Sequence, residues 1–210
     1  MAPLGADFYA RPVLEVAREL IGCTVAHGGS AGVIVETEAY HEGEPACHAF
    51  VGLTERTRPL FGPPGRAYVY RSYGIHAMLN AVCEPAGIGA AVLIRALRPV
   101  AGIEAMRARR GPAIRDHELC SGPGRLTQAL GIGLELNDTD LQSGPVRVLA
   151  REPGGATDAA LVAGPRVGIT RAPALPWRFA VAGDANVSRP RPGGGVRRVA
   201  RVTAGGSGRG

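Results

Sequence analysis

The sequence contains no lysine, and all 24 of its basic residues are arginine. This excludes a Walker-type phosphate loop and any enzyme that forms a Schiff base through a lysine side chain. The arginines outnumber 18 acidic residues, which gives a net charge of +6 and an isoelectric point near 9.7. Surplus arginine is typical of proteins that contact phosphate or nucleic acid, although a protein that is merely basic would show the same balance.

Cysteine is also scarce, and its spacing excludes several kinds of site. The four cysteines form no C-x-x-C pair. Cys47 and His48 are adjacent, but the chain has no second pair of His or Cys residues at metal-ligand spacing. We therefore expect reduced thiols, no metal and no cofactor. The charged first segment and the lack of a long apolar run predict neither a signal peptide nor a membrane span, which is typical of a cytoplasmic protein.

The pattern of short strands and few helices predicts the fold class. A chain of 210 residues can form one large domain or two small ones. Consecutive short strands favour a single α+β domain, with a curved antiparallel or mixed sheet flanked by helices. The expected helices cover 7–21, 100–110 and 118–132, the last beginning near Ser121 or Pro123, and the expected strands cover 22–27, 32–40, 67–73, 75–82, 90–99, 145–150, 166–170 and 178–182.

The composition changes after residue 186. Residues 187–210 are rich in glycine and arginine, and such segments are often mobile. We therefore expect one catalytic domain over residues 1–186 and a basic, mobile tail over 187–210.

The strand expected at 32–40 carries an unusual pair of carboxylates. Side chains alternate along a strand, so Ile34, Glu36, Glu38 and Tyr40 should share one face. Burial of ionised glutamate costs several kcal/mol unless the charge is paired. Either arginines neutralise this face or it opens on a cleft. Arg95 lies within an apolar run and needs a carboxylate or a phosphate as its own partner.

Tyrosines gather in the same quarter of the chain as the carboxylates. Of the five tyrosines, three lie at 68, 70 and 73, and a fourth, Tyr40, lies beside Glu38. Between these groups runs a long polar stretch, 41–66, which ends in Gly-Pro-Pro-Gly and has the length of a functional loop. A pocket lined by aromatic rings with one carboxylate suits a flat, poorly hydrated or cationic ring.

Five segments in order along the chain carry a family resemblance. They are VETEAY (35–40), FGPPGRAYVYRSYGIHAMLN (61–80), VLIRAL (92–97), ELCSGPGRL (118–126) and RVGITRA (166–172). With these segments the sequence resembles the alkyladenine (3-methyladenine/methylpurine) DNA glycosylase family over residues 8–182. The resemblance implies an enzyme that flips a damaged purine out of duplex DNA and hydrolyses its N-glycosidic bond.

The resemblance also implies roles for individual residues. Glu38 matches the general base that activates water, and Arg95 the arginine that holds this carboxylate and the water. Four further matches concern the base: Tyr40 and Tyr70 stack on the flipped base, His48 closes the pocket at the base edge, and Asn80 forms the wall that screens guanine. The main chain of Val167 matches a position near the water. Two matches concern the DNA: Tyr73 is the wedge in the minor groove, and Arg125 contacts a phosphate.

The chemistry of the residues agrees with these implied roles. A purine alkylated at N3 or N7 is cationic, so tyrosine faces attract it, and it leaves with little acid assistance. Without lysine, covalent lyase chemistry through a side-chain amine is closed, which predicts a monofunctional enzyme. The implied partner is double-stranded DNA with damaged purines, bound by a monomer in the cytoplasm at the nucleoid, with no membrane contact.

The sequence departs from the family pattern at two places. The stretch between Tyr40 and His48 is one residue shorter, and Leu53 and Glu55 stand where the family has arginine and proline. Glu36 is expected to be structural rather than catalytic.

Two alternative functions remain open at this point. One is a helix-hairpin-helix glycosylase, because residues 130–133 resemble the hairpin of that family. However, its catalytic aspartate should follow about twenty residues later, whereas Asp138 and Asp140 follow almost at once. The other alternative is a non-catalytic protein that bends DNA or binds lesions.

Overall fold

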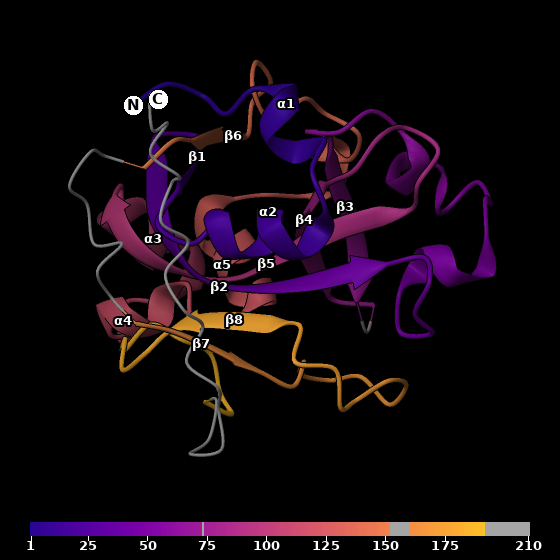
Figure 1. Ribbon diagram of the computed structural model, residues 1–210. Coiled ribbons are helices and arrows are strands. Elements are labelled where there is room, and N and C mark those ends of the chain that lie inside the picture. The colour runs from indigo at the N-terminus through magenta and orange to yellow at the C-terminus, as the bar shows by residue number, and fades with distance from the viewer. Residues whose placement is uncertain (73, 152–159, 192–210) are drawn as a thin grey trace, which may run out of the picture.

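A computed structural model of the protein describes residues 1–72, 74–151 and 160–191 (Figure 1). The helices are α1 Ala6–Tyr9, α2 Val13–Glu19, α3 Ile103–Arg110, α4 Asp116–Leu119 and α5 Pro123–Leu130, with short 3-10 turns η1 His48–Val51, η2 Arg58–Phe61 and η3 Leu134–Leu136. The strands are β1 Thr24–His27, β2 Ser30–His41, β3 Ala67–Ser72, β4 His76–Val82, β5 Ala90–Ala101, β6 Arg147–Leu149, β7 Leu161–Gly164 and β8 Arg178–Val181.

All the described strands belong to one sheet, with β2 at its branch point. The main path runs β3-β4-β5-β2-β1-β6, and every pairing in it is antiparallel. The later half of β2 also pairs with β8, which in turn pairs with β7. The predicted α+β class with a curved sheet is confirmed, and among the described pairings the sheet is antiparallel rather than mixed.

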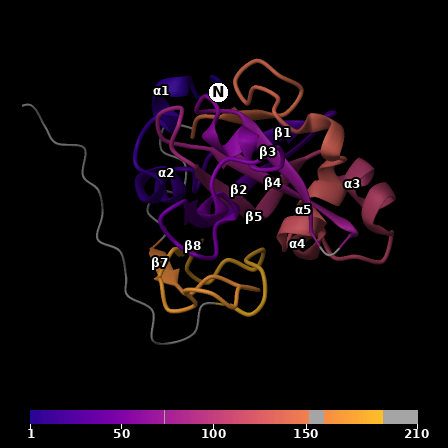
Figure 2. The ribbon, with the colours of Figure 1, turned by 90° about the vertical axis from the view of Figure 1, so that its right-hand side faces the viewer.

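Helices cover both sides of this sheet. Figure 2 shows α1 and α2 on one side and α3, α4 and α5 on the other. Helix α2 packs on β2 and β5, whereas α5 packs on β4 and β5. The main core fills both interfaces, and it holds three of the four cysteines; all four are buried and free. Across the described ranges, no helix has the length and apolar character needed to cross a bilayer.

The single helix expected over 7–21 is wrong, because the chain breaks it into α1 and α2. Pro12 separates the two helices and caps α2, whose Val16 N–H reaches the Pro12 carbonyl. Proline disfavours the helical conformation in the residue before it, so α1 ends before Arg11.

The strand expected at 166–170 is also wrong, since the described strand between β6 and β8 in the chain is β7 at Leu161–Gly164, which pairs with β8. Two features remove 166–170 from the sheet. The Val167 N–H donates to a carboxylate instead of to a strand. Gly168 has a φ of 76°, which a strand does not adopt.

The other predicted boundaries shift by a few residues. Strand β5 continues to Ala101, so α3 begins at Ile103 rather than at 100. The helix expected over 118–132 consists of α4 and α5, and α5 begins at Pro123, a favoured first helical position. The hairpin-like residues 130–133 end α5 and lead into η3, so they do not join two α-helices.

The predicted boundary between domain and tail falls inside the packed chain. Val187 belongs to the core, and Ser188 is buried at 3% exposure. The rest of the expected tail, residues 192–210, lies outside the described residues.

Candidate active site

Irregular pairing between β2 and β5 brings the charged residues of the two strands together. Ile34 pairs with Leu97, Glu36 with Ala96 and Thr37 with Ile94, so Val35 on β2 and Arg95 on β5 are left out of the register. Bulges of this kind redirect side chains and are frequent near active sites. Ile34 and Val35 are both in the main core. The predicted regular alternation from Ile34 is therefore interrupted and resumes at Glu36.

Glu38 is fully buried, and its carboxylate has three polar neighbours. Its Oε1 accepts a 2.7 Å hydrogen bond from the Val167 N–H, and its Oε2 accepts one of 2.8 Å from the Tyr40 hydroxyl. Arg95 Nη1 lies 3.3 Å from Oε2. The sequence predicted that Arg95 would need a carboxylate or a phosphate as its partner, and Glu38 is one such carboxylate.

Glu36 is bound more tightly still and has no access to solvent. It accepts hydrogen bonds from Arg95 Nε, from Arg178 Nε, and from both the N–H and the hydroxyl of Ser188. Four donors on one carboxylate agree with the structural role expected for Glu36.

Arg95 connects the two carboxylates. Burial acts to lower the pKa of Arg95, but the nearby charges of Glu38 and Glu36 outweigh it, so the pKa is raised. The arginine therefore stays charged between two carboxylates, and Arg178 supplies the second positive charge. Two buried cations balance two buried anions, which is the pairing that their desolvation requires.

A cavity of about 710 Å³ lies beside this network. This volume falls within the usual range for small-molecule sites. The expected site residues in its wall are Tyr40, His48, Tyr70, Asn80, Arg95 and Val167. Glu38 is not in the wall, because it lies behind Tyr40, Arg95 and Val167, each of which contacts it.

Part of the cavity wall is an aromatic cluster of His48, Tyr68 and Tyr70. The rings of Tyr68 and Tyr70 stack with centroids 5.4 Å apart, and His48 packs edge-on to Tyr70 at 4.6 Å. The Tyr68 hydroxyl lies 3.1 Å from His48 Nδ1. Burial, with smaller effects of Tyr68 and Glu38, raises the pKa of Tyr70 to about 12, so its ring is a neutral phenol. The shorter loop after Tyr40 therefore still delivers His48 to the cavity.

Burial lowers the pKa of His48, and the charge of Arg56 adds to the effect. The unfolded chain therefore binds a proton at His48 at a higher pH than the folded chain does. Stability rises with pH wherever the unfolded state binds more protons, so acidification below about pH 6.5 destabilises the fold through this residue. We expect His48→Gln to reduce the loss of unfolding free energy between about pH 7.5 and about pH 5.5, measured by urea titration. The matched control is exposed His76→Gln, and an equal reduction in both variants would contradict the assignment.

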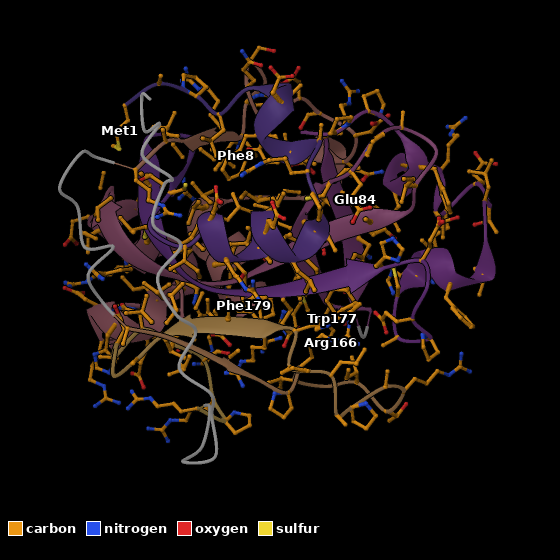
Figure 3. The ribbon with its side chains drawn as sticks, viewed as in Figure 1. Met1, Phe8, Glu84, Arg166, Trp177 and Phe179 are labelled. Atoms are coloured by element: carbon orange, nitrogen blue, oxygen red, sulfur yellow. The ribbon has the colours of Figure 1, made fainter. Side chains whose placement is uncertain are left out.

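A second buried ion pair supports Tyr40 from the protein side. Arg166 forms a bidentate pair with Glu44, at 2.6 and 2.8 Å, and also donates to the Ala39 carbonyl. Its guanidinium lies 4.6 Å from the centre of the Tyr40 ring and 5.3 Å from that of Trp177. Figure 3 labels Arg166 and Trp177, which lie next to each other. Arg166 is absent from the cavity wall, so it holds Tyr40 from behind.

The two residues expected to contact DNA are placed differently. Arg125 lies in the first turn of α5 and lines a neighbouring cavity of about 460 Å³, together with Arg110 and Arg189. Arg95 lines both cavities, so the second one adjoins the first. Tyr73 lies outside the described residues. Within 1–72, 74–151 and 160–191, no group of three His, Cys, Asp or Glu residues could hold a metal ion.

The sequence is similar to those of known proteins. A family model described as methylpurine-DNA glycosylase matches residues 7–185. The chain belongs to the methylpurine-DNA glycosylase family. A Rhodopseudomonas palustris protein of strain HaA2 is 54% identical to this chain, over 90% of this chain and 91% of its own. A second one, of strain CGA009, is 52% identical over 88% of this chain and 87% of its own. A Bradyrhizobium diazoefficiens protein is 52% identical over 90% of this chain and 92% of its own. All three relatives carry the provisional name 3-methyladenine DNA glycosylase.

The family membership confirms the resemblance and the enzyme class predicted from the sequence. Sequence reasoning nevertheless missed four residues that surround the candidate site, namely Arg178, Arg166, Glu44 and Ser188. Arg178 and Arg166 had a usable signal, since each interrupts an apolar segment as Arg95 does. Glu44 and Ser188 had none, because each lies in a stretch with the composition of a loop or tail.

Proposed function

We propose that the protein is a DNA glycosylase that hydrolyses the N-glycosidic bond of damaged purines, 3-methyladenine among them, after flipping the nucleotide out of duplex DNA. Glu38 acts as the general base on a water molecule, and the product strand keeps an intact abasic site. The enzyme works as a monomer in the cytoplasm, at the nucleoid, and needs no cofactor.

The observation that carries the proposal is the position of Glu38 immediately behind an aromatic cavity. A base stacked between Tyr40 and Tyr70 would lie in this cavity, and only the cavity wall would stand between the base and the Glu38 carboxylate. Stacking on aromatic rings contributes about 1–3 kcal/mol per base. The cavity therefore supplies binding energy for a flipped base, and His48 and Asn80 supply polar groups at its edges.

Water activation requires one rearrangement of this site. The Tyr40 hydroxyl donates a hydrogen bond to Glu38 Oε2, and Glu38 has no exposure to solvent. A water can reach this oxygen only when Tyr40 gives up its hydrogen bond. We propose that stacking of the base on the Tyr40 ring shifts the hydroxyl and admits the water. The buried carboxylate is thus exposed to water only when a base is present.

The surroundings of the cavity suit a DNA duplex. Arg56, Arg71 and Arg171 line the same cavity as the aromatic rings, and Arg125 lines the neighbouring one. Arginine is well suited to phosphate oxygens, and such contacts position a duplex without reading its sequence. We propose that the damaged strand crosses both cavities.

The test is release of 3-methyladenine from duplex DNA treated with a methylating agent, measured by chromatography of the free base. The strand should remain intact until alkali is added, because the chain has no lysine for a lyase step. Tight binding of the methylated duplex without any base release would instead support a lesion-binding protein.

Replacement of the proposed wedge residue should separate flipping from binding. We expect Tyr73→Ala to weaken flipping, because the gap left in the base stack is no longer filled, and to leave non-specific binding nearly unchanged. Fluorescence of a base analogue at the flipped position reports the first quantity, and titration with undamaged duplex reports the second. Equal losses of both would place Tyr73 in the packed protein rather than in the DNA.

A further inference from the structure

The segment that follows β8 returns to the ion network and closes it. Val187 is in the core, and Ser188 lies between Glu36 and Arg95. Arg178 binds the main chain of this segment, since the Nη2 of Arg178 donates to the carbonyls of Ser188 and Pro190. The family model ends at residue 185, before Val187 and Ser188.

Ser188 uses all of its polar groups on the network. Its N–H donates to Glu36 Oε2 at 2.7 Å, and its hydroxyl lies 2.9 Å from Glu36 Oε1. The same hydroxyl oxygen accepts a 3.2 Å hydrogen bond from Arg95 Nη2. A hydroxyl has one proton, and Arg95 can only donate, so the proton of Ser188 goes to Glu36. The orientation of the hydroxyl is thereby determined.

These contacts fix the direction of the Arg95 guanidinium. Its Nε is bound to Glu36 and its Nη2 to Ser188, which together hold one edge of the planar group. The remaining nitrogen, Nη1, points to Glu38 Oε2 at 3.3 Å. If the Nη2 contact were lost, one hydrogen bond, from Nε to Glu36, would remain on this edge. The guanidinium could then turn, and Nη1 would move away from Glu38.

We propose that Ser188 is a positioning residue for base release, acting through Arg95 on Glu38. This inference rests on the proposed function. Ser188 lines the neighbouring cavity and is absent from the wall of the aromatic one, so it acts without touching the flipped base. The hydroxyl keeps Nη1 beside Glu38 while the Tyr40 hydroxyl is displaced, so that the carboxylate keeps one charged partner throughout the reaction.

The chain offers a matched control for a buried hydroxyl. Thr37 is fully buried on β2 and donates a 2.7 Å hydrogen bond to the Ala17 carbonyl in α2, away from the arginine network. Thr37→Val removes a hydroxyl of similar burial without disturbing Arg95. A purely structural role for Ser188 predicts the same pattern of effects in both positions.

The experiment compares Ser188→Ala, Ser188→Thr, Ser188→Val and Thr37→Val in the full-length protein. Single-turnover release of 3-methyladenine from methylated duplex, with enzyme in excess, gives the rate of the chemical step, and titration with undamaged duplex gives DNA affinity. We expect Ser188→Ala and Ser188→Val to slow release about tenfold or more with DNA affinity unchanged, because a hydrogen bond to a charged group is lost. Ser188→Thr should release base faster than Ser188→Val, which carries the same added methyl group without the hydroxyl, and Thr37→Val should release base at the wild-type rate.

Other outcomes would overturn the inference. An active wild type with unchanged release in Ser188→Ala, equal rates for the Thr and Val variants at 188, or equal slowing in Thr37→Val would reduce Ser188 to a structural residue while leaving the proposed function intact. A wild type that released no base would overturn the proposed function and this inference together. If Ser188→Ala fails to fold, the Thr and Val pair still isolates the hydroxyl.

Discussion

Glu38→Gln should slow base release by roughly 10²- to 10⁴-fold, the range that a positioned general base contributes. Glutamine has nearly the same shape and can still accept the Val167 N–H, so the cavity should keep its form. Its amide cannot take a proton from water. The rate of 3-methyladenine release from methylated duplex should therefore fall, while the affinity for that duplex should remain.

A second carboxylate provides the control for this change. Glu42, just after β2, accepts a 2.7 Å hydrogen bond from the Gly89 N–H and does not line the cavity. Glu42→Gln should release base at the wild-type rate. Full activity in Glu38→Gln would remove Glu38 from the chemistry and would require another base. A loss of binding together with activity would show that the carboxylate supports the pocket instead.

The largest effect on stability is expected from Arg166→Met. The side chain of Arg166 has no exposure and that of Glu44 has 5%, so the change leaves a buried carboxylate with no cation beside it. Removal of one partner of a buried ion pair costs about 3–5 kcal/mol. Tyr40 and Trp177 also lose the guanidinium that packs on their rings. The free energy of unfolding, measured by denaturant titration, should fall by about this amount.

A double variant separates the charge from the packing. In Arg166→Met with Glu44→Gln, the charge left behind is gone, and the glutamine oxygen can still accept the Ala46 N–H that Glu44 accepts now. Most of the lost stability should therefore return, because replacing a whole buried pair costs far less than breaking it. A double variant as unstable as the single one would mean that the contacts of the guanidinium, rather than its charge, stabilise the fold.

Much of the sheet could be predicted because its strands follow local rules. The alternation in 67–73 and the apolar runs at 75–82 and 90–99 each became a strand near the predicted place. The pairing of Arg95 with carboxylates followed from the cost of burying an isolated charge. These features depend on residues close together in the sequence or on a general energetic rule.

The features that escaped prediction depend on long-range contacts. Ser188 joins Glu36 across 152 positions of the chain, and Arg166 joins Glu44 across 122. No local pattern marks Ser188 or Glu44. Arg166 interrupts an apolar segment, but nothing near it in the sequence indicates which carboxylate it pairs with. The bulge at Arg95 is likewise a property of two strands together, and it sets which side chains meet. The hydrogen bond from the Tyr40 hydroxyl to Glu38 joins residues that are close in the sequence. It nevertheless depends on the rotamers of the two side chains, which the composition does not reveal.

The buried cysteines have a consequence for a protein whose proposed substrates are made by methylating agents. The thiolate is the reactive form of cysteine, and burial raises the pKa of all four thiols, to about 11 for Cys47 and about 12 for Cys120. At neutral pH these sulfurs stay protonated, and packing shields them from solutes. The chain also carries no lysine amine. The buried thiols are therefore shielded from the electrophiles that damage DNA, and the chain offers these electrophiles no lysine amine to alkylate.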